Sequence, residues 1–220
     1  MKRYKGFVLR AVLFVFIGAL FVFGVLSLYS MEVMADLKDN LVRLHVIADS
    51  DDAEAQALKL KVRDSVAAYT GTLLAEADSA EESLTILREN IENIESVAKE
   101  TIAAEGHSEP VKVTVGEFDF PLKSYGNITL PTGNYNALRV VIGSGSGRNW
   151  WCVLFPPLCF VDTAAEEVSA SGMDRLEENL TGESFDVING SGENLVLRFK
   201  IVDFFENVAQ KVKTAWTNIF

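Results

Sequence analysis

The stretch at residues 149–162, NWWCVLFPPLCFVD, holds the side chains of this chain that are best suited to chemistry. Its two cysteines, Cys152 and Cys159, are the only cysteines in the sequence. A thiol can act as a nucleophile, as a metal ligand or as half of a disulfide, and in an apolar stretch it is often only a buried core residue. Each use needs different companion residues, which the rest of the sequence either contains or lacks.

The spacing of the possible metal ligands argues against a metal site. A structural zinc site needs four ligands, and only His45 and His107 could join the two cysteines, with no CxxC or HxxxH spacing. The GSGSG run at residues 143–147 is glycine-rich, but a phosphate-binding loop must be followed by a helix N-terminus. Here the apolar residues Trp150 and Trp151 follow. We therefore expect no metal and no cofactor.

A cysteine hydrolase requires a thiolate beside a histidine base. His45 is the histidine that could serve Cys152 or Cys159, because His107 lies in the polar stretch EGHSEP. Neither cysteine is followed by an elbow glycine or a helix start, so nothing local marks a nucleophile. The two prolines midway between the cysteines favour a turn, which would allow a disulfide in an exported chain. Reduced core thiols and a catalytic cysteine stay open as alternatives.

The N-terminus indicates the compartment in which this chemistry would operate. Four basic residues and no acid lie among the first ten residues, and residues 11–29 carry no charge. At a rise of about 1.5 Å per residue, this run just spans the hydrocarbon core of a bilayer. Basic residues before it predict that the remainder of the chain is exported. Because Val33 and Ala35 offer a signal-peptidase site, residues 1–35 are either a cleaved signal or a membrane anchor.

The charge of the chain bears on its partners. The formal net charge is −11, and all 31 acidic residues follow the apolar run. This balance argues against binding nucleic acid or anionic lipid through bulk charge. The exported part is long enough to bury a sizeable core, and one α/β domain is the expectation.

Hydrophobic periodicity predicts the N-terminal elements of that domain. Residues 41–48, LVRLHVIA, alternate in the manner of a strand. A helix follows, with Asp51 at its N-cap and Gly71 at its end. A second helix starts at the capping box of Ser79 and continues to Gly106 with apolar residues at helical spacing.

Three further strands are expected at residues 111–115, 137–142 and 150–155, the last two joined by the glycine loop as a hairpin. Residues 166–180 favour a short helix, and residues 201–219 carry an amphipathic helical repeat. The predicted fold is therefore of the α/β class (α+β type). A mostly antiparallel sheet carries two long N-terminal helices and a C-terminal amphipathic helix, and one N-terminal apolar helix precedes them.

Three blocks of the chain resemble the stage II sporulation protein R family of endospore-forming Firmicutes. They are LVRLHVIADSDDAEAQALKLKVRDSV at residues 41–66, FPLKSYGNITLPTGNYNALRVVIGSGSGRNWWCVLFPPLCFVD at residues 120–162 and VLRFKIVDFF at residues 196–205. The resemblance covers nearly all of residues 36–206, which we interpret as one globular signalling domain. Residues 207–220 extend beyond it as a helical tail.

The resemblance implies a function. Members of the family are made in the forespore and exported to the space between the two membranes of the developing cell. There they trigger a membrane-embedded aspartic-type protease of the mother cell to process pro-sigma-E. The chain would be a protease activator and not an enzyme, with no nucleic acid and no small-molecule substrate. The alternative is an anchored cell-envelope hydrolase that uses Cys152 or Cys159 with His45.

The residues that would contact the protease are a hypothesis based on side-chain type. Aromatic and arginine side chains favour binding hot spots, and the acidic turn with the basic helix face matches the family's first block. Burial of both tryptophans in the core is the alternative. The hypothetical contact residues are Arg43, His45, Asp49, Ser50, Asp51, Gln56, Lys59, Lys61, Arg63, Trp150 and Trp151.

Overall fold

The structure is a computed structural model that describes residues 2–158 and 170–189 of the chain. Two compact units make up the chain. The larger unit is Asp36–Leu195, and the other includes Met1–Ala35.

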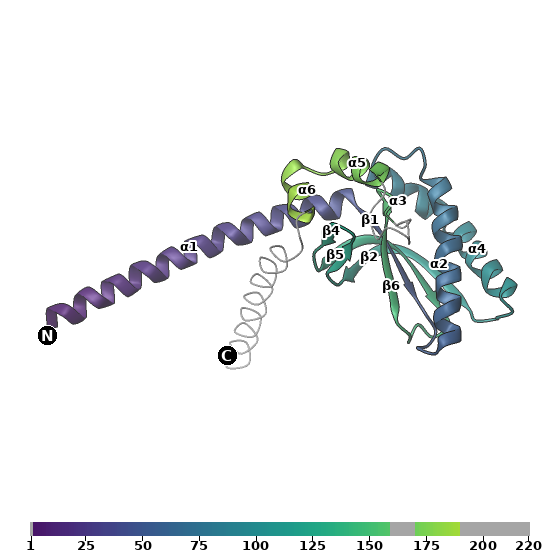
Figure 1. The fold of residues 1–220 in the computed structure, drawn as a ribbon, viewed down its shortest axis with the longest axis horizontal. Helices are drawn as coiled ribbons and strands as arrows, with labels where there is room; N and C mark the ends of the chain where they lie inside the picture. The colour runs from purple at the N-terminus through teal and green to yellow at the C-terminus, as the bar shows by residue number, and fades with distance from the viewer. Residues whose placement is uncertain (1, 159–169, 190–220) are drawn as a thin grey trace. The chain divides into compact units, whose positions relative to one another are not determined.

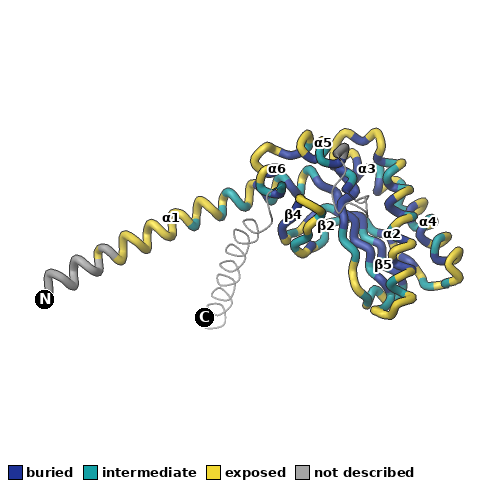
Figure 2. Tube along the Cα trace, viewed as in Figure 1, coloured by how far each residue is buried: buried dark blue, intermediate teal, exposed yellow. Residues whose placement is uncertain are grey.

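The N-terminal helix α1 (Lys2–Asn40) is a continuous helix of 39 residues. Within its segment Val12–Asn40, a window of 18 residues has a mean hydropathy of 2.6, so this helix is long and apolar enough to cross a membrane. Large apolar side chains such as Phe14 and Phe21 are exposed along it, as Figure 2 shows for this stretch. The predicted apolar helix is confirmed. Its use as an anchor or as a cleaved signal stays a prediction, because a signal sequence has the same properties.

A four-stranded sheet in the order β2-β5-β1-β6 forms the centre of the larger unit. The strands are β1 (Val42–Ile47), β2 (Val111–Phe120), β5 (Gly133–Ile142) and β6 (Asn149–Phe155). β1 runs parallel to β5 and antiparallel to β6, and β2 runs antiparallel to β5. The predicted α/β class with a mostly antiparallel sheet is confirmed.

The predicted hairpin of β5 and β6 is wrong, because β1 lies between these two strands. β1 is buried along nearly its whole length. One side of β1 is apolar and the other side buries an arginine. A central place in the sheet, with a neighbouring strand on each edge, buries both sides. The glycine-rich connection therefore passes over the end of β1 and does not form a tight turn.

Three helices cover one face of this sheet: α2 (Ala53–Leu73), α3 (Ala80–Glu89) and α4 (Ile91–Ala104). Figure 1 shows α2 and α4 side by side against the strands. Val42, Leu44 and Val46 of β1 point into this core. They pack with the apolar stripes that the sequence predicted on the helices, including Val62 and Ile94.

The limits of the helices differ from the predicted ones in three places. Asp52, and not Asp51, caps α2. Gly71 lies inside α2, since the extra turn brings Leu74 into the core and offsets the cost of about 1 kcal/mol for a helical glycine. The second predicted helix begins with its Ser79 cap as expected, but it breaks at Asn90 into α3 and α4. The amide of Asn90 donates to the last turn of α3, which ends that helix.

Smaller elements complete the described chain. The turn-rich segment before β5 forms a hairpin of β3 (Lys123–Tyr125) and β4 (Ile128–Leu130), which was not predicted. Helix α5 (Ala170–Asn179) falls within the helix predicted at residues 166–180. A further helix, α6 (Gly182–Ile188), is capped by Thr181 and packs on β4. The predicted C-terminal helix lies outside the described residues.

Candidate functional site

The strand face turned away from α2, α3 and α4 gathers the polar and aromatic residues that the sequence singled out. Because side chains alternate along a strand, the odd residues of β1 point to this side, and the register of the sheet places their neighbours. We call this surface the distal face. It consists of Arg43, His45, Ile47, Lys112, Thr114, Gly116, Phe118, Phe120, Tyr135, Ala137, Arg139, Val141, Asn149, Trp151 and Val153.

Arg43 is fully buried at one end of the distal face. Its Nη2 donates to the hydroxyl of Tyr125 at 2.6 Å, and its Nε donates to the carbonyl of Cys152 at 3.4 Å. Its guanidinium lies 4.2 Å from the ring centroid of Phe120 and 5.0 Å from that of Tyr135. Arg43, one of the hypothetical contact residues, is therefore buried, and its contact with a partner stays a prediction. A guanidinium is planar and weakly hydrated, so aromatic rings can replace part of its water.

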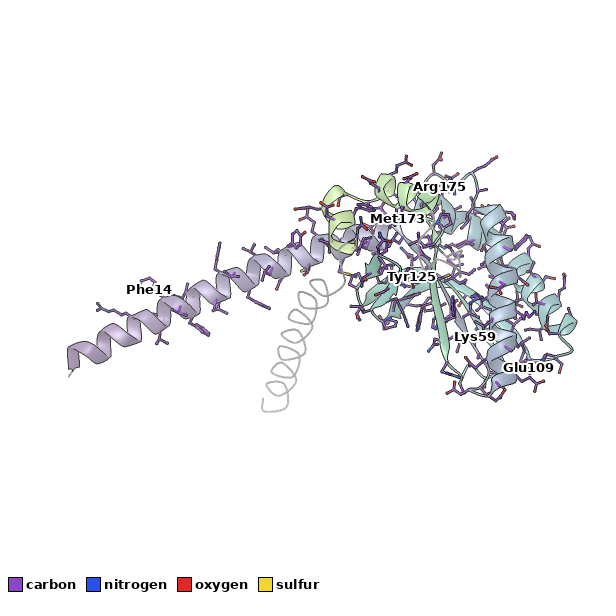
Figure 3. The ribbon with its side chains drawn as sticks, viewed as in Figure 1. Phe14, Lys59, Glu109, Tyr125, Met173 and Arg175 are labelled. Carbon is purple, nitrogen blue, oxygen red and sulfur yellow. The ribbon has the colours of Figure 1, made fainter. Side chains whose placement is uncertain are left out.

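Tyr125, which Figure 3 labels on β3, connects this arginine to the edge strand. Its hydroxyl accepts from Arg43 and donates to the carbonyl of Trp151 at 3.1 Å. Burial raises the pKa of this hydroxyl, so it stays protonated and can fill both roles. The β3–β4 hairpin thus closes one end of the distal face.

His45 lies in the middle of the distal face and is only 7% exposed. Its ring stacks on Trp151 with the centroids 3.7 Å apart, and its Nε2 lies 2.7 Å from Oδ1 of Asn149. Burial lowers the pKa of His45 to about 4. The hydrogen bond to Oδ1 of Asn149 opposes this shift, and the nearby charges of Arg139 and Arg43 add to it. The imidazole is therefore neutral at physiological pH, and it packs with Trp151.

A row of four side chains crosses the sheet at the level of His45. Thr114 of β2 faces Arg139 of β5, which is the neighbour of His45 in β1, and His45 faces Trp151 of β6. Arg139 is half-exposed, and its guanidinium lies 4.0 Å from the ring centroid of Phe118. Arg139 was not among the residues predicted for this surface, although its place in the alternating stretch NALRVVI is the signal that could have identified it.

Cys152 and His45 lie on opposite sides of the sheet. Cys152 pairs with Leu44 and packs in the core under the helices, whereas His45 pairs with Trp151 on the distal face. Cys152 is also disulfide-bonded. A Cys152–His45 catalytic pair therefore does not form in this fold. Cys159 lies outside the described residues, so its pairing with Cys152 and its use by a hydrolase stay predictions.

Two of the predicted contact residues hold the glycine loop against the turn after β1. The Oδ1 of Asp49 accepts from the backbone N–H of Ser144 at 2.6 Å, and the Oδ1 of Asp51 accepts from that of Arg148 at 2.7 Å. Gly143 has a φ of +57°, and a Cβ there would lie 2.1 Å from Oδ1 of Asp49. The acidic turn therefore needs glycine opposite it.

The start of α2 extends this connection. Gln56 donates its amide to the carbonyl of Ser50 at 2.8 Å. Lys59, labelled on α2 in Figure 3, donates to Oε1 of Gln56 at 2.7 Å and to the carbonyl of Arg148 at 3.2 Å. Lys59 is buried, and this burial lowers its pKa. Asp49, Ser50, Asp51, Gln56 and Lys59 thus make contacts within the domain, and their hypothetical contact with a partner stays untested.

The three remaining predicted contact residues lie on the helix side of the sheet. Arg63 covers Trp150 with its guanidinium 4.1 Å from the ring centroid, and it pairs with Asp64. Trp150 is partly buried against the core. Lys61 is exposed. The two neighbouring tryptophans therefore belong to different surfaces, and only Trp151 lies on the distal face.

Similarity to known proteins covers the part of the chain that builds this face. The family model described as stage II sporulation protein R matches residues 38–165. Stage II sporulation protein R of Bacillus subtilis (strain 168) is 38% identical over 139 residues, which are 63% of this chain and 62% of the relative. The aligned part is thus less than two thirds of that relative's length. No solved structure matches the chain. The matched residues include all four strands of the sheet.

Proposed function

Because the chain belongs to the stage II sporulation protein R family, we propose that it is an exported sporulation signal that activates a protease. The protease is a membrane-embedded, aspartic-type enzyme of the mother cell, which then removes the pro-sequence of pro-sigma-E. The chain itself acts as a non-catalytic ligand. The observation that carries this proposal is the family match across the whole sheet.

The N-terminal helix supports export across the forespore membrane. Val12–Asn40 is apolar enough to span a bilayer, and the basic residues before it favour a cytoplasmic N-terminus. The following domain would then lie in the space between the two membranes. There it could meet a protease held in the opposite membrane, either anchored by α1 or released after cleavage.

The positions of His45 and Cys152 favour a non-catalytic ligand over a cysteine hydrolase. His45 is neutral, buried and stacked on Trp151. Cys152 lies on the other side of the sheet. A general base must reach the proton that it removes, and the His45 ring does not reach the Cys152 thiol.

Activation by such a ligand is a shift of population between two forms of the protease. The ligand must bind the active form more tightly than the inactive form, since only that difference moves the equilibrium. Each factor of ten in relative affinity supplies about 1.4 kcal/mol. A domain whose loops are held by internal hydrogen bonds suits this role, because little binding energy is lost in ordering it.

The test is reconstitution in bacteria that lack other sporulation proteins. The candidate protease and pro-sigma-E are produced together with this chain directed outward, and loss of the pro-sequence is followed by gel shift. Cleavage that requires this chain and survives Cys152→Ser supports a non-catalytic signal. Absence of cleavage, with the chain folded and exported, would refute the proposal.

A further inference from the structure

We propose that the distal face binds the protease, and that it does so by accepting a carboxylate from an outward-facing segment of that protein. This inference rests on the proposed function and adds the surface and the chemistry of recognition. Arg139 meets the carboxylate directly, and Trp151 packs against the apolar side chains beside it.

The charge of the distal face is opposite to that of the chain. Its positions hold the cationic residues Arg43, Lys112 and Arg139 and no aspartate or glutamate. The chain as a whole carries 31 acidic residues and a net charge of −11. A cationic surface within an acidic protein selects an acidic group on a partner and repels cationic ones.

Four polar atoms of the distal face are buried without a hydrogen-bond partner in the part of the chain that the structure describes. They are Nη1 of Arg43, Nδ1 of His45, Oγ1 of Thr114 and Nε of Arg139. An unpaired buried polar group costs about 1–3 kcal/mol, so a native fold that keeps several together calls for an explanation. Three of the four belong to adjacent residues of the row across the sheet.

Three of these four atoms, those of Arg43, Thr114 and Arg139, lack an acceptor. Arginine nitrogens can only donate, and a threonine hydroxyl can donate as well. A carboxylate offers two oxygens with about four acceptor sites and pairs with a guanidinium in a planar, two-bond geometry. A carboxylate that binds the half-exposed guanidinium of Arg139 would therefore place acceptors beside donors that are unpaired among the described residues.

The exposed part of the distal face suits a protein segment. Arg139, Trp151, Ile47 and Val141 are half-exposed, which places an arginine and a tryptophan among aliphatic side chains. Arginine and tryptophan are enriched among the residues that dominate protein interfaces. The surface thus fits a carboxylate that is flanked by apolar side chains on the partner.

An anionic bilayer is the competing occupant. The 31 acidic residues of the chain oppose its approach to a negatively charged surface. A single carboxylate on a protein segment meets only the local charge of the distal face. The charges therefore favour the protein partner.

Site-specific photocrosslinking in the reconstituted cells tests where the protease binds. A photoreactive amino acid is placed at Val141 on the distal face or, as the matched control, at Glu92, which is exposed on α4. We expect crosslinks to the epitope-tagged protease from position 141 and at least tenfold fewer from position 92. Crosslinks from position 92 alone, or from position 141 into lipid alone, would overturn the inference.

Charge reversal tests the carboxylate. Arg139→Glu is expected to lower both processing and crosslinking at least tenfold, and Arg88→Glu, which reverses an exposed charge on α3, is expected to change neither. Replacing the contacted acid of the protease by arginine should restore processing with Arg139→Glu. Arg139→Gln, checked for unchanged urea unfolding, separates loss of the pair from loss of the fold.

The two proposals fail in different ways. If the wild-type chain triggers processing and Arg139→Glu does so equally well, the docking inference is wrong and the proposed function stands. If the wild-type chain triggers no processing but crosslinks to the protease from position 141, the docking inference stands and activation is wrong. If neither processing nor crosslinking occurs, both are wrong.

Discussion

Acid should destabilise this protein through His45, and replacing this residue by glutamine should remove that effect. The His45 ring is buried against Trp151, and its pKa falls from 6.5 to about 4 on folding. As the pH drops below 6.5, the unfolded chain binds a proton at this residue and the folded chain does not. The contribution of neutral His45 to the free energy of unfolding is therefore fully present above pH 6.5 and is lost as the pH falls toward 4.

The size of this effect follows from the two pKa values. One pKa unit corresponds to about 1.4 kcal/mol, so the free energy of unfolding should fall by about 2.5 kcal/mol between pH 7.5 and pH 4.5 through His45 alone. In His45→Gln this contribution is absent. Loss of the stacked ring pair should cost the variant about 1 kcal/mol at pH 7.5, so the two proteins should be equally stable near about pH 6.

The assay is urea unfolding of the full chain in non-ionic detergent, followed by tryptophan fluorescence at several pH values. The hydrogen-bonded carboxyl groups of Glu95 and Glu109, whose pKa values are also lowered, titrate in both proteins. Their contribution cancels in the difference between wild type and variant. A difference in unfolding free energy that stays constant from pH 7.5 to pH 4.5 would show that burial does not hold His45 neutral.

Three further predictions concern stability and are measured by urea unfolding. Gly143→Ala should cost about 2 kcal/mol or more, because its φ is +57° and Asp49 fills the space of a Cβ. The control Gly106→Ala, with a φ of +81° and open space around it, should cost about 1 kcal/mol. Equal costs for the two variants would contradict the role of the acidic turn. Tyr125→Phe should cost about 1–3 kcal/mol, since it leaves a nitrogen of the buried arginine and the carbonyl of the edge strand unpaired; an unchanged midpoint would refute this. Cys152→Ser should cost about 2–5 kcal/mol and expose one alkylatable thiol per chain by mass spectrometry; a wild-type chain that already alkylates without reduction would disprove the disulfide.

Sequence patterns predicted the elements whose signals are local. The apolar run of α1, the alternation of β1 and the Ser79 cap of α3 each depend on residues close together in the chain. The predicted helix boundaries were wrong at Gly71 and Asn90, and the cause of these two errors lies in tertiary packing. A helix continues through a glycine, or breaks at an asparagine, according to what the next turn can bury.

The sequence alone therefore determined the apolar helix, the mixed α/β class and the family, because periodicity, composition and long motifs can be read along the chain. Only the tertiary structure decided which side chains meet. By inserting β1 between β5 and β6, it placed Arg139, His45 and Trp151 in one row and sent Cys152 to the other side of the sheet. The physical reason is that strand order depends on the free energy gained by burying both faces and both edges of β1. The residues that contribute to this free energy lie about 100 positions apart in the sequence.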